Sequence, residues 1–255
     1  MAELYWKKGI AAVENSTEDE DVSVYAGIAQ RLAGLKYLWG EYEAALKIAQ
    51  PAVDRLEKLG RDTTSEYTNL LIYAGCCQCR HGISEATTYD NMTRAYNLHL
   101  DYIKRHPIAT SYRDAIVGVI CISYTFIEIN DYDKALVWLS RMAELIRGYL
   151  QTEDARPDYA EKQLARYYIY RAIALEGVHR SAEAAEAYQT YLKPNPYSRG
   201  KEPGWHLSWR GRTMAGGCRQ LHQPERADER LQGWLFARDY TGSAAQEVRG
   251  QPQCR

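Results

Sequence analysis

A short pattern that returns along the chain constrains its fold more than any other feature. It begins at Gly40 in "GEYEAALKIA", where an aromatic residue follows two positions later and Ala45 three positions after that. The stretch then continues as an amphipathic helical pattern to residue 60. Because the pattern returns around Ala135 in "NDYDKALVWL" and around Ala184 in "HRSAEAAEAY", we expect a chain built from repeated helical units.

Small residues recur in register with these alanines. A weaker copy of the pattern, "HGISEATTYD", places Ile83 and Ala86 in the aromatic and alanine positions. Twelve positions before the alanine of each copy stands another small residue, at Ala33, Ala74, Ser123 and Ala172. Small residues at two fixed positions let paired antiparallel helices approach closely, and the turn between them needs Gly, Asn or a polar residue.

This arrangement resembles the tetratricopeptide repeat over about residues 20–195. The first and third copies match best; the second lacks the aromatic residue, and the fourth has Ser181 there. The alanines are spaced more widely than the ~34 residues of the usual repeat, so we expect long helices with extended loops such as "EKLGRDTTSEY" and "LQTEDARPDYA". The resemblance implies an all-α fold, a right-handed superhelix of antiparallel helix pairs.

The character of the chain changes at about residue 199. The segment 199–255 contains no isoleucine and no helical apolar stripe longer than a turn or two. Two interpretations stay open. One is a disordered or irregular terminus. The other is a frameshift: with suitable synonymous codons, reading residues 206–254 one base forward gives a further helical unit. We therefore expect a helical repeat domain over 1–198 and an irregular tail, non-native or disordered, over 199–255.

Composition and motifs argue against several classes of function. The 32 basic and 33 acidic residues leave a net charge of -1, so the chain has no general attraction for nucleic acid or acidic membranes. No apolar run approaches the ~20 residues of a membrane span, and the amino terminus has no signal-peptide core. Phosphate-binding loops, a nucleophile elbow and His-Glu-x-x-His are absent from the sequence. We expect no catalytic residues, no cofactor and no bound metal.

The segment "CCQCRH" is the one cluster of potential metal ligands. On a helix Cys76 and Cys79 share a face, as do Cys77 and His81. One helix cannot wrap four ligands tetrahedrally around zinc, so we favour reduced, small apolar core residues over a metal site.

Two further groups of polar residues are interpreted structurally. His99 and His106 flank "DYIKR" and are expected on a helix surface. The acidic run "STEDEDVS" is expected to cap and solvate the start of a helix.

The resemblance also implies candidate binding residues. In tetratricopeptide repeats the first helix of each pair lines a concave groove through regularly spaced positions. Carried over to this sequence, these positions are Gln30, Gly34, Tyr37, Ile120, Tyr124, Ile127, Arg166, Ile169, Ile173 and Glu176. The Lys and Asn set with which family members clamp a terminal carboxylate is missing. The alternative is that neighbouring repeats or partner helices bury the apolar members of the set.

The repeat texture is similar to the sensor region of Bacteroidetes two-component histidine kinases and regulators. We therefore expect a non-catalytic scaffold for a protein or peptide partner, a truncated sensor region that lacks the downstream kinase parts. A stand-alone cytoplasmic adaptor or chaperone-like peptide binder, or an enzyme with a site between repeats, are the alternatives. Without a signal peptide the chain is cytoplasmic by default, and extracytoplasmic if it is a fragment of that family. Self-association through the exposed carboxyl end of the array is a further expectation.

Overall fold

The structure, a computed structural model, describes residues 2–13, 15–82 and 85–192, and its regular elements are all helices. In chain order they are α1 (Ala2–Val13), α2 (Asp19–Leu38), α3 (Tyr42–Lys58), α4 (Ser65–Arg80), α5 (Glu85–Arg105), α6 (Ala109–Glu128), α7 (Tyr132–Tyr149), α8 (Pro157–Gly177) and α9 (Ser181–Leu192). The all-α prediction is confirmed for these ranges. The predicted tail 199–255 and Ile83 of the weak copy lie outside the described residues.

The chain divides into two compact units. The first comprises residues 1–37 and 42–194, and the packing described below is internal to it. The second comprises 38–41 and 195–255; of this unit the structure describes residues 38–41, which hold the last residue of α2 and the turn after it.

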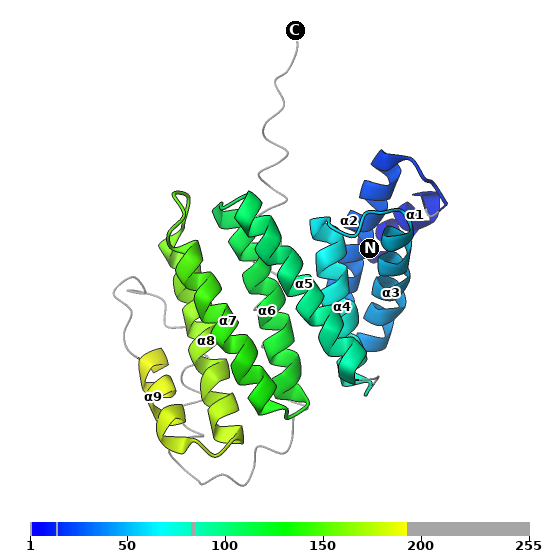
Figure 1. The fold of residues 1–255 in the computed structure, drawn as a ribbon. Helices are drawn as coiled ribbons and strands as arrows, with labels where there is room; N and C mark the ends of the chain where they lie inside the picture. Colours follow the sequence, from blue (N-terminus) through cyan, green and yellow to red (C-terminus); the bar gives the residue numbers. More distant parts are fainter. Residues whose placement is uncertain (1, 14, 83–84, 193–255) are drawn as a thin grey trace. The chain divides into compact units, whose positions relative to one another are not determined.

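From α3 onward, each helix packs against the next helix in the chain. Contacts between alternate helices add to this order, because α4 packs on α6 and α6 on α8. Gly34 of α2 lies against the ring of Tyr73, which extends the series of alternate contacts to α2 and α4. Figure 1 shows α6, α7 and α8 lying side by side. The result is an array of helices packed in sequential order.

The small residues of the repeat lie at the helix contacts, as predicted. The four residues Ala33, Ala74, Ser123 and Ala172 have no exposed surface. The key alanines are buried as well, at Ala45, Ala135 and Ala184. Side chains larger than these would separate the packed helices, because protein interiors are filled to crystal-like density.

The turns inside the pairs share one backbone conformation. The second residue after each first helix has a positive φ, 74° at Gly40, 66° at Gly82, 62° at Asn130 and 60° at His179. At Asn130 the amide of the next residue, Asp131, donates to the carbonyl of Phe126 at 2.8 Å, and at His179 Arg180 donates to Leu175 at 2.9 Å. These are Schellman-type helix ends, which require a left-handed residue. The predicted turn positions are confirmed at Gly40, Asn130 and His179; in the weaker copy the left-handed residue is Gly82, one position after the His81 that the pattern indicated.

The helix ends follow their local chemistry. Asp19 is one of three acidic residues in the first turn of α2, where carboxylates stabilise the helix dipole as predicted for the acidic run. The side chain of Asp131 accepts from the amide of Lys134 and caps α7. Of the helices described, none combines the length and the apolar character needed to span a bilayer.

The surface position expected for His99 is wrong. Its side chain is 5% exposed because it lies in the stripe of α5 that includes Met92, Tyr96 and Ile103, all buried. The spacing of three and four residues along this stripe was available in the sequence. His106, one residue beyond α5, is exposed.

Candidate functional site

The residues carried over from the repeat family lie on α2, α6 and α8. On α2, Gln30 is half-buried, whereas Gly34 and Tyr37 are buried. On α6, Ile120 is fully buried and Tyr124 and Ile127 are half-buried. The members on α8 retain more exposed surface, with Arg166, Ile169 and Ile173 half-buried and Glu176 exposed.

Tyr37 and Tyr124 meet around an arginine that the sequence interpretation missed. Arg80, at the end of α4, has a side chain only 7% exposed. Its guanidinium carbon lies 4.2 Å from the ring centre of Tyr42, 5.0 Å from that of Tyr37 and 5.9 Å from that of Tyr124. A guanidinium over aromatic rings is attracted by their negative faces, the more so when water is excluded.

Thr125 and Glu128 of α6 contact the guanidinium of Arg80. Its Nε donates to Oε2 of Glu128 at 2.5 Å, and Nη2 forms an ion pair with the same carboxylate. Its Nη1 donates to Oγ1 of Thr125 and to the carbonyl of Cys76 at 3.3 Å. We call the set Tyr37, Tyr42, Arg80, Tyr124, Thr125 and Glu128 the Arg80 cluster.

Burial and neighbouring groups shift the pKa values of Tyr37 and Arg80 in the Arg80 cluster. Burial raises the pKa of Tyr37 well above its ordinary value, so its hydroxyl stays protonated. Burial disfavours the charged form of Arg80, but Tyr37 and Glu128 outweigh this effect and hold its pKa above the ordinary value. The ion pair of Arg80 and Glu128 therefore lies at the centre of the cluster. Removing one partner of such a pair leaves an uncompensated buried charge, which is strongly destabilising.

The carried-over residues on α8 make separate contacts. Arg166 donates to Oε1 of Gln163 at 3.1 Å on its own helix, and the hydroxyl of Tyr188 in α9 donates to Glu176 at 3.0 Å. Tyr124 of α6 connects the two regions, since its ring centre lies 5.7 Å from that of Tyr170 in α8. The structure thus gathers the α2 and α6 tyrosines at Arg80 and leaves the α8 residues as a second group.

A signal for Arg80 was present in the sequence. It is a basic residue in the last turn of a first helix, and aromatic residues occupy nearby repeat positions at Tyr37 and Tyr124.

Two of the three cysteines of the segment "CCQCRH" are core residues, whereas Cys79 is half-buried. Cys76 and Cys77 have no exposed surface, and burial raises the pKa of Cys76 to about 11 and that of Cys77 to about 12. Thiols with such pKa values carry almost no reactive thiolate at neutral pH. Within the described ranges no three His, Cys, Asp or Glu side chains come together as metal ligands.

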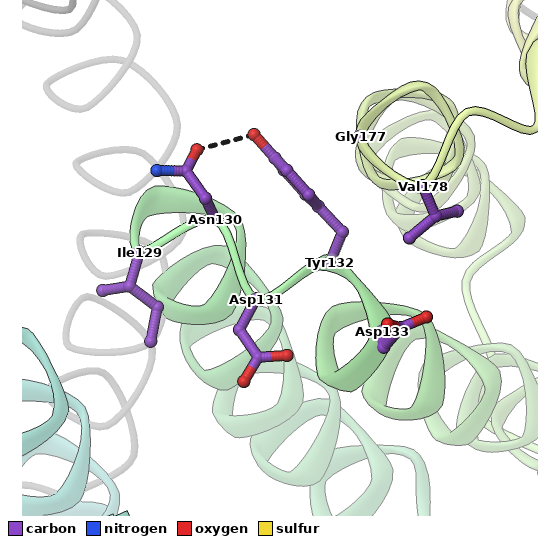
Figure 2. A pocket seen from close by; sticks show the side chains of 7 residues that line it. All are labelled: Ile129, Asn130, Asp131, Tyr132, Asp133, Gly177 and Val178. Carbon is purple, nitrogen blue, oxygen red and sulfur yellow. Dashed lines mark hydrogen bonds between the residues drawn. The ribbon is translucent and has the colours of Figure 1, made fainter.

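A hollow of about 660 Å³ lies where the turn between α6 and α7 faces the end of α8. Its lining residues are Ile129, Asn130, Asp131, Tyr132, Asp133, Gly177 and Val178. Figure 2 shows the hydroxyl of Tyr132 reaching Oδ1 of Asn130, to which it donates at 2.6 Å. The ring of Tyr132 lies where a Cβ on Gly177 would be, so the glycine makes room for this ring.

Two titratable groups, the buried His99 and the half-buried Asp114, lie elsewhere in the array. Burial lowers the pKa of His99 to about 4. Burial raises the pKa of Asp114 to about 6, and nearby Glu66 adds to the rise while Arg113 opposes it. Neither His99 nor Asp114 lines the hollow at α7, so the two groups and the hollow do not form a common reaction site.

The comparisons with known proteins give no family assignment. No protein-family model matches the chain, and no curated protein is significantly similar to it.

Proposed function

We propose that the helical residues form a tetratricopeptide-like, right-handed superhelix of antiparallel pairs, and that this array is a non-catalytic scaffold that binds a protein or peptide. The observation that carries the proposal is the repeated register. A left-handed turn residue recurs two positions after each first helix, at Gly40, Gly82, Asn130 and His179. The small residues that the structure shows buried beside these turns are Ala33, Ala45, Ala74, Ser123, Ala135, Ala172 and Ala184. Helix pairs repeated in this way stack on their neighbours and create an extended binding surface.

The binding surface in this proposal is the face of α8 that carries Arg166, Ile169, Ile173 and Glu176. Their spacing of three or four residues places them on one side of the helix. The side chains keep access to solvent and combine apolar and charged character. Such a face suits an extended peptide with an apolar side chain between charged or polar groups.

In a signalling protein, an array of this kind would act as a sensor region, as the resemblance to two-component regulators implies. The proposed role is recognition of a peptide or protein signal, with any catalytic step assigned to other modules.

A selection from displayed random peptides on the full chain tests the binding proposal. Peptides that bind the wild type should lose at least about fivefold in affinity with Arg166→Ala or Glu176→Ala, the loss typical of a residue central to an interface. Arg147→Ala and Glu144→Ala are matched controls, because both residues are exposed on the second helix α7. They should leave the affinity unchanged.

Two results would overturn the proposal. One is that no peptide is enriched over many rounds of selection. The other is that the selected peptides bind equally well to the α8 variants and to the α7 controls, which would place their binding site elsewhere.

A further inference from the structure

The Arg80 cluster joins helices that a simple linear array would keep apart. The hydroxyl of Tyr37, at the end of α2, lies 3.2 Å from the carbonyl oxygen of Cys121 and 3.1 Å from Oγ1 of Thr125, both on α6. In a linear repeat array each unit contacts only its neighbours. Here the first helix of the first pair bonds directly to the first helix of the third pair.

The second helix of the first pair makes a similar connection. Tyr42 opens α3, and its hydroxyl lies 3.3 Å from both carboxylate oxygens of Glu128 at the end of α6. The rings of Tyr37 and Tyr42 are also in contact, with centres 5.6 Å apart. The two tyrosines of the first pair thus bond to three groups of α6, the carbonyl of Cys121, the hydroxyl of Thr125 and the carboxylate of Glu128.

Arg80 adds the middle pair to this connection. It belongs to α4 and donates to Thr125 and Glu128, two of the groups that the tyrosines contact. Its guanidinium lies over the two tyrosine rings. Each of the three pairs therefore contributes at least one side chain, and the shared acceptors make their bonds interdependent.

The same connection does not recur one repeat later. In the repeat register, the positions of Thr125 and Glu128 correspond on α8 to Ala174 and Gly177. Neither has a side chain that accepts a hydrogen bond. Between α6 and α8 the ring pair Tyr124–Tyr170 occupies the junction instead.

We propose that the Arg80 cluster is a clasp that makes the first three helix pairs, α2 to α7, open as one cooperative body, whereas α8 and α9 open separately. Arg80 is its positioning residue, because its fork of donors holds both α6 acceptors where the tyrosines reach them. The cooperative opening of α2 to α7 does not depend on a peptide bound to α8.

Native-state hydrogen exchange of the full chain, read by peptide mass spectrometry, tests the clasp. Tyr37→Phe removes one hydroxyl and keeps the ring over Arg80, so the chain should still fold. When opened helices close again faster than their amides exchange, the loss of a hydrogen bond of ordinary strength raises the exchange rate about fivefold to tenfold. We expect this rise together in α2 to α7, with α8 and α9 unchanged.

Tyr188→Phe is the matched control, because the hydroxyl of Tyr188 bonds to Glu176 within the last pair. It should raise exchange in α8 and α9 only. A rise confined to α2 in Tyr37→Phe would overturn the clasp, as would an equal rise through α9. Combining Tyr37→Phe with Glu128→Gln gives a second test. Groups of one network are expected to be coupled, so the rise in α6 exchange of the double variant should differ from the product of the rises in the two single variants. A rise equal to that product would also overturn the clasp.

Discussion

His99 provides a sharp test of how the core of this array is packed. Its imidazole is buried between α5 and α6, and Nε2 would lie 3.5 Å from a Cβ on Gly118. Nε2 has no hydrogen-bond partner, so a proton added there would place a cation in an apolar contact. Burial accordingly lowers the pKa of His99 from 6.5 to about 4.

This shift has a definite sign for stability. Between pH 6.5 and pH 4 the unfolded chain binds a proton that the folded chain rejects, so the stability linked to His99 is present above pH 6.5 and is lost as the pH falls toward 4. From the two pKa values, the free energy of unfolding should fall by about 2 kcal/mol between pH 7 and pH 5. Asp114 opposes this trend, because a carboxyl whose pKa is raised to about 6 on folding adds stability as the pH falls through that value.

Comparison with His99→Gln isolates the histidine from Asp114. Urea unfolding followed by circular dichroism at pH 7 and pH 5 gives the free energy of unfolding of both proteins. The wild type should lose about 2 kcal/mol relative to His99→Gln on this change of pH, since all other titrations cancel in the difference. His106→Gln replaces an exposed histidine and should keep the wild-type profile.

The reasoning would be refuted by parallel wild-type and His99→Gln profiles between pH 7 and pH 5. That result would mean that the imidazole is solvated or paired in the folded chain. The packing of α5 on α6 at Gly118 would then be wrong.

Three further predictions concern the glycines, the turns and the tail. Gly177→Ala should lower the free energy of unfolding, measured in urea, by about 1–3 kcal/mol, because the added methyl overlaps the ring of Tyr132. Gly27→Ala in α2 has no atom near the new methyl and should raise the free energy of unfolding by about 0.5–1 kcal/mol. His179→Gly should raise it by about 0.5–1 kcal/mol, since glycine relieves the left-handed strain at φ 60°; a loss of stability in urea unfolding would contradict the turn geometry. Deleting residues 199–255 should leave the melting temperature unchanged or higher, and a large fall would show that this tail packs on the helices.

Much of the helical framework could be predicted from the sequence. The alternation of small residues with turn residues indicated the positions of Ala33, Ala45 and Asn130 correctly, because these features are local. A helix repeats every 3.6 residues, and a turn needs only its own few residues to adopt its conformation. The irregular tail expected after residue 198 is still a prediction from the sequence alone.

The buried polar contacts required the tertiary structure. Arg80 is separated from Glu128 and Thr125 by more than forty positions, and nothing in its neighbourhood along the chain specifies them. They meet because small residues bring α4 and α6 close together, and the exclusion of water then makes the ion pair and the ring contacts depend on each other. His99 is buried for the same reason. The sequence determined which residues form helices and turns, whereas the stacking of the pairs decided which side chains became a clasp, a core histidine or an exposed face, because burial depends on neighbours that are distant in the chain.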